Sequence, residues 1–307
     1  MTAAIALHGG AGGADQEEGD QRMRVLAAAR DVGAAVLARG GGAVDAVTEA
    51  VCVLEDAPLF NAGTGSVLTW DGAIEMDASI MTEGDAFGGV GAVRDLRHPV
   101  RAARAVMEET EHWLLVGEGA LALARAHVWG VPWDPETPAR RVRWRALRDE
   151  VLRAARDAGG PADAALAHRE RLVAFVKAHP QVAGTPGTVG AVALDREGRA
   201  AAATSTGGMW LKLPGRVGDS ALPGAGTFVG PGGAVSATGH GEAILRVQLA
   251  RRAEYLLRTM DAPAAAARAI AEATAAGCDA GLVTVDRRGG TGFAFNTATM
   301  PVEAGRV

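Results

Sequence analysis

The order of the apolar segments constrains the fold of this 307-residue chain more than any single motif does. Segments with helical spacing follow one another in successive pairs, and segments with the alternation of strands follow one another as hairpins. A parallel sheet needs a long crossover, usually a helix, between consecutive strands. The order therefore favours antiparallel sheets covered by layers of helices, in an α+β protein. With 48% hydrophobic residues, the chain can bury a core of that kind.

Helical spacing begins near the N-terminus. Apolar side chains recur at helical intervals from residue 21 to about 39, and the three glycines at 40–42 end that segment. A second helix is predicted directly afterwards, over residues 43–55. Further helices are predicted over residues 99–127 (with a break near Gly117), 242–258 and 263–276.

Strand-like segments occur at both ends of the chain and in its middle. "AAIALH" (3–8) is a short apolar strand, and residues 66–81 are interpreted as a hairpin around an Asp-Gly turn. Residues 188–195 and 200–208 are predicted to pair, and residues 280–297 to close the chain as a hairpin.

Residues 130–187 are rich in Pro, Arg and Ala and only partly helical in pattern. We interpret them as a variable linker region whose last part, "KAHPQVAGTPG", is an exposed connector. With that region included, residues 1–307 are enough for one large domain or two small ones.

Several functions are excluded by bulk properties. The net charge is −5 and no basic block stands out, so nucleic acid is not an expected partner. No run approaches the roughly 20 apolar residues of a membrane span, and the start lacks the basic region of a signal peptide, so we expect a cytoplasmic protein. Cys52 and Cys278 form no disulfide framework and lack zinc-ligand spacing, so both are expected to be buried free thiols.

The stretch "GTPGTVGAVALD" (184–195) contains Gly-Thr twice. Thr185 precedes a proline, whereas Thr188 opens an apolar, β-prone run. A threonine that opens a strand is held by a sheet, so its hydroxyl can be aimed. Gly187, with no Cβ, leaves its own carbonyl open to attack.

Cleavage of the bond before Thr188 would give one residue both a hydroxyl and an α-amine. The unperturbed pKa of an α-amine, about 7.7–8.0, suits a base at neutral pH, and such an amine is one known means of activating threonine. The alternative is that Gly-Thr at a strand start is ordinary turn chemistry.

Three other motifs carry residues suited to chemistry, and each also has an ordinary structural explanation. Arg216 and Asp219, in "GRVGDS", can face one small zwitterion as a bidentate carboxylate clamp and an ammonium acceptor, or can be a surface ion pair. Thr206 lies 18 residues after Thr188, on the strand predicted to be its neighbour. The ordinary explanation is that this threonine caps a glycine turn. Asn61 lies in "PLFNAG", where asparagine also suits a tight turn.

Two glycine-rich segments are not nucleotide sites. "HGGAG" (8–12) and "GPGG" (230–233) lack both the Lys-Ser/Thr ending of a P-loop and a complete GxGxxG. His8 and its glycines are better interpreted as a close-packed strand end beside a site.

Several of these motifs occur together in one order. "HGGAG", "PLFNAGTGSVL", "EMDASIM", "GTVGAVALD", "TSTGG", "GRVGDS" and "SATGHGE" resemble the threonine-dependent asparaginases of the N-terminal nucleophile hydrolase superfamily, also called plant-type L-asparaginases or isoaspartyl peptidases. The resemblance runs from residue 8 to "FNT" at 295–297, and residues 130–186 do not match.

The resemblance implies a precursor that cleaves itself between Gly187 and Thr188, giving an α chain (1–187) and a β chain (188–307). The Thr188 hydroxyl first attacks the Gly187 carbonyl and later the side-chain amide of a substrate, so that an acyl-enzyme forms and water releases aspartate. Thr185 has no role in either step.

Roles for further residues follow from the same resemblance. Thr206 hydrogen-bonds the nucleophile, and Asn61 aids the oxyanion of self-cleavage. The remaining positions divide into an oxyanion hole (Thr238 and Gly239) and substrate recognition (Arg216, Asp219, Gly239 and Gly241). His240 is expected at the pocket rim, and "DSA" stands where the family commonly has "DSP", which loosens the recognition loop.

A structural sodium ion is also implied, held by main-chain carbonyls as suits a hard cation. Its ligands would be Leu54, Glu55, Ala57, Phe60, Ala62 and Thr64. No cofactor is expected for catalysis.

The family fold would be a four-layer αββα sandwich with two stacked antiparallel sheets, formed by residues 1–307 as one domain and assembled as a homodimer of αβ heterodimers. The expected substrates are L-asparagine and isoaspartyl dipeptides. The alternatives are a glycosylasparaginase-like amidase and a poorly processed, non-catalytic binding protein.

Overall fold

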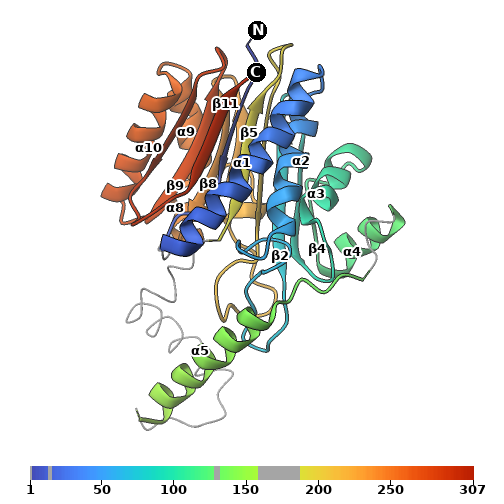
Figure 1. The fold of residues 1–307 in the computed structure, drawn as a ribbon, viewed down its shortest axis with the longest axis vertical. Helices are drawn as coiled ribbons and strands as arrows, with labels where there is room; N and C mark the ends of the chain where they lie inside the picture. Colours follow the sequence, from blue (N-terminus) through green and yellow to red (C-terminus); the bar gives the residue numbers. More distant parts are fainter. Residues whose placement is uncertain (1, 13–15, 128–131, 158–186) are drawn as a thin grey trace.

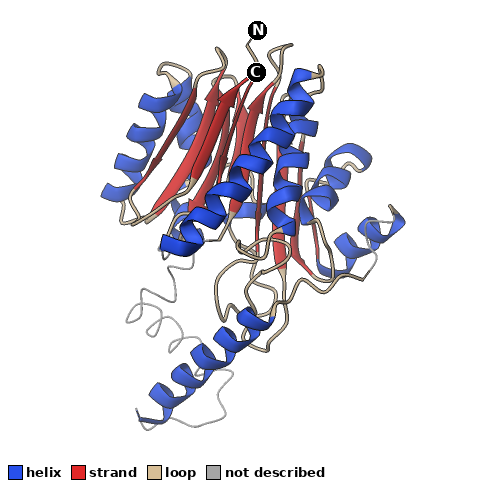
Figure 2. Cartoon of the chain, viewed as in Figure 1, coloured by secondary structure: helices blue, strands red, loops and turns tan. Residues whose placement is uncertain are grey.

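The computed structural model describes residues 2–12, 16–127, 132–157 and 187–307, and within them two β-sheets form the centre of the protein (Figure 1, Figure 2). The larger sheet has the strand order β11 (Val302–Arg306), β1 (Ala4–His8), β5 (Val189–Leu194), β6 (Ala200–Thr206), β2 (Met76–Thr82), β3 (Phe87–Val93) and β4 (Leu114–Val116). The smaller sheet has the order β10 (Thr291–Phe295), β9 (Ala280–Asp286), β8 (Gly233–Gly239) and β7 (Thr227–Gly230).

The two sheets face each other and carry helices on their outer faces. β5 and β6 contact β8 across the interface between the sheets. The larger sheet is covered by α1 (Gln16–Ala38), α2 (Ala43–Asp56) and α3 (Pro99–Glu109), and the smaller by α9 (Leu249–Leu257) and α10 (Ala262–Ala275), as Figure 1 shows.

Side chains of β5 show why this arrangement suits the sequence. Val189, Ala191 and Ala193 pack in the core beneath α1 and α2, whereas Val192 and Leu194 pack between the sheets. Alternate residues of a strand point to opposite faces, so a strand buried on both faces must be apolar throughout. This explains the continuous apolar run that follows Thr188.

The prediction of purely antiparallel sheets is wrong at one edge. β3 and β4 pair in parallel, with Gly89 opposite Leu114. The chain leaves β3, passes through α3 and returns to the same sheet, and such a crossover brings the next strand back in the same direction. The other strand pairs of both sheets are antiparallel.

The helix predicted over residues 242–258 is in fact two helices, α8 (Gly241–Val247) and α9. Gln248 separates them in a left-handed conformation, with φ of 51°. The main-chain N–H groups of Ala250 and Arg251 donate to the carbonyls of Ala225 and Gly224, at 3.0 and 2.9 Å. The first turn of α9 is therefore bonded to the loop before β7, which periodicity does not reveal.

The other predicted segments are mostly confirmed. The strands at β1, β5 and β6, the closing hairpin of β9 and β10, and the helices α2 and α10 lie where predicted. α1 starts at Gln16, earlier than predicted, and the segment 99–127 contains β4 between α3 and α4 (Gly117–Ala126).

The hairpin predicted over 66–81 contains a single bridge between Leu68 and Ile74, because β2 pairs instead with β3 and β6. The strands β3 and β11 were not predicted.

Part of the expected linker region is a helix. α5 (Pro138–Asp157) projects from the rest of the chain at the lower end of Figure 1. Thr185 lies outside the described residues. Cys52 and Cys278 are buried and free, as predicted. No helix in the described part of the chain has the length and apolar character to cross a membrane.

Candidate active site

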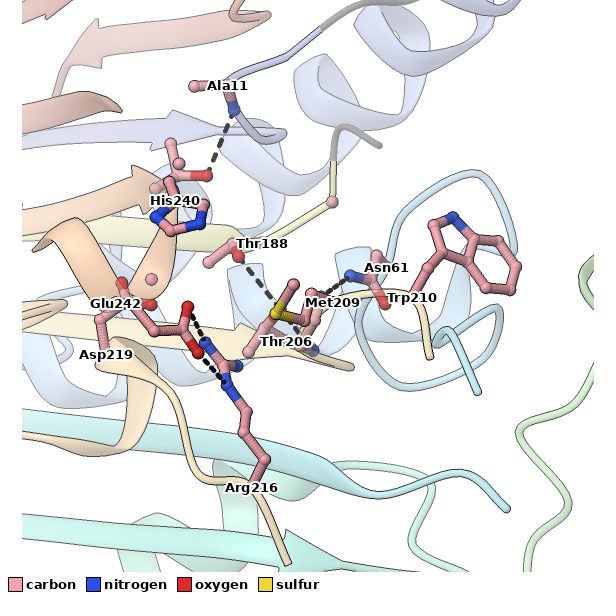
Figure 3. A pocket seen from close by; sticks show the side chains of 15 residues that line it. Ala11, Asn61, Thr188, Thr206, Met209, Trp210, Arg216, Asp219, His240 and Glu242 are labelled. Atoms are coloured by element: carbon pink, nitrogen blue, oxygen red, sulfur yellow. Dashed lines mark hydrogen bonds and ion pairs between the residues drawn. The ribbon is translucent and has the colours of Figure 1, made fainter. Parts of the chain in front are cut away.

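One pocket brings together the residues that the sequence motifs single out (Figure 3). Its lining includes the predicted site residues Asn61, Gly187, Thr188, Thr206, Arg216, Asp219, Thr238, Gly239, His240 and Gly241. These residues come from both sheets and from the loops at one end of them, so the pocket exists only in the folded chain.

Thr188 lies immediately before β5, which β1 and β6 hold on both sides. Its Oγ1 donates a hydrogen bond to Oγ1 of Thr206, the last residue of β6, at 3.0 Å. The main-chain N–H of Gly208 donates to the same Thr206 oxygen at 3.0 Å. The Thr188 hydroxyl is therefore held in one direction by a partner that is itself fixed.

The carbonyl in front of Thr188 is held by Asn61. The main-chain N–H of Asn61 donates to the Gly187 oxygen at 3.0 Å. The Asn61 side chain is engaged elsewhere, since Nδ2 donates to the Gly208 carbonyl at 2.6 Å and Oδ1 accepts from the Val67 N–H at 2.8 Å. A Cβ on Gly187 would lie 2.2 Å from the Cβ of Asn61, so only glycine fits in this place.

The smaller sheet contributes Thr238 and Gly239 at the end of β8. The Thr238 side chain is buried, and its Oγ1 accepts from the main-chain N–H of Ala11 at 3.2 Å. His240, the next residue along, is exposed at the pocket edge (Figure 3).

Arg216 and Asp219 converge on Gly241. A Cβ on Gly241 would lie 2.5 Å from Arg216 Nη2 and 2.7 Å from Asp219 Oδ1. Asp219 is buried, and its Oδ2 has no hydrogen-bond partner among the described residues. Burial raises the pKa of this carboxyl to about 7, although the Arg216 charge opposes the shift. The pocket therefore holds a buried acceptor oxygen that no group in the described part of the chain hydrogen-bonds.

Glu242 was missed by sequence reasoning. Its carboxylate accepts from Arg216 Nε at 3.0 Å and Nη2 at 2.9 Å (Figure 3). The sequence did offer a signal for this residue: Glu242 directly follows "TGHG" and belongs to the motif "SATGHGE", which also contains Thr238 and Gly239.

Two further carboxylates, also missed, fix the loop that carries Arg216. Glu75 Oε2 accepts from the Gly215 N–H at 2.7 Å, and Asp77 Oδ2 accepts from the Gly218 N–H at 2.9 Å. Lys212 is buried beside them and donates from Nζ to the Glu75 carbonyl at 2.6 Å. Arg216 is thus bracketed by two anchored main-chain amides.

His8 lies behind the nucleophile candidate, between the sheets. Its Nε2 is 3.0 Å from Ser236 Oγ, and a Cβ on Gly190 would lie 2.6 Å from that nitrogen. Burial lowers the pKa of His8 to about 3, so the ring is neutral and a weak base at neutral pH. This agrees with the interpretation of a close-packed strand end.

The turn between α2 and Asn61 packs main-chain carbonyls closely against two glycines. A Cβ on Gly63 would lie 2.4 Å from the Glu55 oxygen, and one on Gly65 would lie 2.6 and 2.9 Å from the Pro58 and Phe60 oxygens. Main-chain oxygens gathered in this way are the ligand type that a hard cation prefers. Two of these oxygens already accept hydrogen bonds, the Glu55 oxygen from the Thr64 N–H at 2.7 Å and the Phe60 oxygen from Arg140 Nη2 at 3.3 Å.

A second set of potential ligands lies nearby. Cys52, Glu55 and His98 bring ligand atoms within 4.8 Å of one another. Burial raises the pKa of the Cys52 thiol well above its usual range, which disfavours the thiolate that a metal needs. Glu55 Oε1 already accepts from the Val100 N–H and the Ser205 hydroxyl, at 3.0 and 2.6 Å. We interpret this group as a buried anchor between α2 and α3.

Comparison with known proteins agrees with this geometry. The model of a family described as asparaginase matches residues 1–306. The chain belongs to the asparaginase family. The resemblance drawn from the motifs is thereby confirmed, and the family model extends over residues 130–186, where no motif matched.

Individual relatives of this asparaginase-family chain carry two kinds of name. It is 44% identical over 308 aligned positions to the "Plant-type L-asparaginase" of Pyrococcus abyssi, covering 97% of this chain and 94% of the relative. It is 42% identical over 311 positions to the "Isoaspartyl peptidase" of Salmonella typhimurium, covering 97% and 93%. It is 42% identical over 262 positions to the "Isoaspartyl peptidase/L-asparaginase" of Bos taurus, covering 83% and 77%.

Proposed function

We propose that this protein is an amidohydrolase that cleaves its own Gly187–Thr188 bond and then hydrolyses L-asparagine and isoaspartyl dipeptides. One observation carries the proposal. The Thr188 hydroxyl is bonded to Thr206 at 3.0 Å, in the same pocket in which Asn61 bonds the carbonyl before Thr188. Nucleophile, scissile carbonyl and oxyanion donor are thus adjacent.

Self-cleavage follows from these three groups. The Thr188 oxygen attacks the Gly187 carbonyl carbon, and the Asn61 N–H stabilises the negative charge that develops on the carbonyl oxygen. The C–N bond breaks, the proton of the hydroxyl passes to the nitrogen, and an ester joins Gly187 to the Thr188 side chain. Water hydrolyses the ester, leaving a carboxylate on Gly187 and an α-amine on Thr188.

The same hydroxyl then attacks the substrate amide. The new α-amine accepts the hydroxyl proton, because its pKa lies near neutral pH, and Thr206 keeps the oxygen aimed. The Thr238 hydroxyl and the Gly239 N–H stabilise the second oxyanion. Ammonia or an amine leaves with the transferred proton, and water releases aspartate from the Thr188 ester.

Arg216 and Asp219 recognise the rest of the substrate. The Arg216 guanidinium binds the α-carboxylate, and Asp219 with the Gly241 backbone binds the α-ammonium. Asparagine and the isoaspartyl unit share this end and differ only in the group that leaves, so one pocket serves both. The names of the Pyrococcus and Salmonella relatives support both substrates.

Further features belong to the same proposal. The carbonyls of Leu54, Glu55, Ala57, Phe60, Ala62 and Thr64 would hold a structural sodium ion, which would stiffen the turn beside Asn61. Catalysis itself uses no cofactor. The stacked sheets with outer helices support a four-layer αββα sandwich of the N-terminal nucleophile type.

We propose one domain of residues 1–307, matured into chains 1–187 and 188–307 with 130–187 as a variable linker. It acts as a cytoplasmic homodimer of αβ heterodimers, and His240 forms the pocket rim.

Two measurements test the proposed function. Denaturing gels of the purified protein should show two fragments, and a single 31.3 kDa band after long incubation would instead indicate an uncleaved binding protein. Release of ammonia from asparagine, and of amine from an isoaspartyl dipeptide, should exceed hydrolysis of a glycosyl-asparagine. The reverse ranking would indicate a glycosylasparaginase-like amidase.

A further inference from the structure

The part of the chain just before α5 lies over the turn that carries Asn61. Trp133 Nε1 donates to Thr64 Oγ1 at 3.2 Å, and the Gly65 N–H donates to the Pro135 carbonyl at 2.8 Å. These contacts come from a segment to which the motif analysis assigned no function. They bring the first turn of α5 up to the active site.

Arg140, in that first turn, contacts the Asn61 turn directly. Its Nε donates to the Gly65 carbonyl at 2.7 Å, and its Nη2 donates to the Phe60 carbonyl at 3.3 Å. The guanidinium carbon also lies 5.9 Å from the ring centroid of Trp210, which lines the active-site pocket. Arg140 thus joins α5, the Asn61 turn and the pocket wall.

The Phe60 carbonyl and the Asn61 N–H belong to one peptide group. In a trans peptide these two groups point in opposite directions within one plane. A cation that holds the Phe60 oxygen on one side therefore aims the Asn61 N–H on the other, where it meets the Gly187 oxygen at 3.0 Å. Hydrogen bonds in such a chain also polarise one another, so the N–H becomes a stronger donor.

We propose that Arg140 is a positioning residue for self-cleavage, acting through the Phe60–Asn61 peptide on the Gly187 carbonyl. It touches no reacting atom. The Asn61 side chain cannot replace the main-chain N–H as the donor to the Gly187 oxygen, because both of its polar atoms are already bonded to Gly208 and Val67. This inference rests on the proposed function and assigns to the linker region a part in maturation.

The test compares the rate of self-cleavage with the activity of the matured enzyme. Full-length chains are produced by cell-free synthesis, and the appearance of the two fragments is followed on denaturing gels at constant sodium concentration. The variants are Arg140→Met, Arg140→Lys and, as a control, Arg143→Met. Arg143 is an exposed arginine of the same helix.

Loss of a whole oxyanion donor lowers a rate by about 10²–10³-fold, so a donor that is present but misaligned should lower the rate of self-cleavage about tenfold. Arg140→Met should cleave about tenfold more slowly than the wild type, and Arg143→Met at the wild-type rate. Arg140→Lys should fall between, because an ammonium reaches one carbonyl rather than two. Once matured, all variants should show kcat for asparagine within about twofold of the wild type.

Each contrary outcome has a distinct meaning. Wild-type cleavage by Arg140→Met would overturn the inference, as would an equal loss in cleavage rate and in kcat, which indicates general damage to the pocket. If Arg140→Met does not fold, the intermediate rate of Arg140→Lys decides. A wild-type chain that never cleaves would instead contradict the proposed function.

Discussion

Arg216 and Glu242 face each other in the active-site pocket as a two-point ion pair, with Nε–Oε1 and Nη2–Oε2 distances of 3.0 and 2.9 Å. Glu242 is the more exposed partner, with 49% of its side chain accessible against 16% for Arg216. The pair therefore fixes the guanidinium from the solvent side. A second edge of the planar group is left to meet a substrate carboxylate.

Removal of Glu242 should weaken substrate binding without slowing chemistry. Charge-assisted hydrogen bonds contribute about 1.5–3 kcal/mol, so Glu242→Ala should raise KM for asparagine about tenfold and leave kcat nearly unchanged. Glu242→Gln keeps one acceptor for the fork and should lie between. Glu272→Ala, which breaks an exposed pair on α10, is the control. A lower KM in Glu242→Ala would show that Glu242 competes with the substrate rather than orienting Arg216.

Arg216→Ala should separate recognition from maturation. Truncating one partner of a buried charge pair costs about 2–5 kcal/mol, so KM should rise by at least about thirtyfold. Self-cleavage should proceed at the wild-type rate, because that step binds no external ligand. Steady-state kinetics and a cleavage time course on the same preparation check both halves. An unchanged KM would remove Arg216 from the substrate site.

Asp219→Asn should remove activity yet stabilise the protein at neutral pH. The folded pKa of Asp219 is raised to about 7 from a usual value of 3.8, so the folded state holds this proton more tightly than the unfolded chain does. The contribution of Asp219 to the free energy of unfolding is therefore fully present below pH 3.8 and is lost as the pH rises through about 7. The side chain introduced by Asp219→Asn carries no charge at any of these pH values, so the variant avoids that loss.

Thermal unfolding at several pH values measures this effect. The Tm of Asp219→Asn should exceed that of the wild type at pH 8, and the two should approach each other near pH 4. A wild type that is equally or more stable than the variant at pH 8 would show that the Asp219 carboxylate is stabilised by contacts beyond those of the described residues.

Sequence reasoning located the candidate site residues named from the motifs, but not Glu242, whose side chain lies in the same pocket. Thr188, Thr206, Arg216 and Asp219 stand in recognisable contexts, and the structure places them in one pocket. The apolar run after Thr188 was likewise enough to predict a strand, and the structure shows that the strand is buried on both faces.

Other missed features depend on bonds to main-chain groups or to segments far away in the sequence. Glu75 and Asp77 bind main-chain amides of residues 215 and 218, and such partners leave no pattern of their own. β11 pairs with β1 at the opposite end of the chain, with Arg306 opposite Ala4, and no local signal predicts that register. The break at Gln248 has the same origin, because it depends on bonds to residues 224 and 225.

Thr188→Ala and Thr185→Ala distinguish the two Gly-Thr copies. Thr188→Ala should abolish both self-cleavage and hydrolysis, because it removes the attacking oxygen of both steps. Thr185→Ala should mature normally and keep wild-type kcat. Blocked maturation in Thr185→Ala, or the appearance of fragments from Thr188→Ala, would show that Thr188 is the wrong choice of nucleophile.

The most direct test is the mass and N-terminal sequence of the polypeptide that is present during full turnover. An active preparation should contain a fragment beginning Thr-Val-Gly-Ala, and its amount should rise in step with the rate of ammonia release. Full turnover by chains in which residues 187 and 188 are still joined would contradict the account.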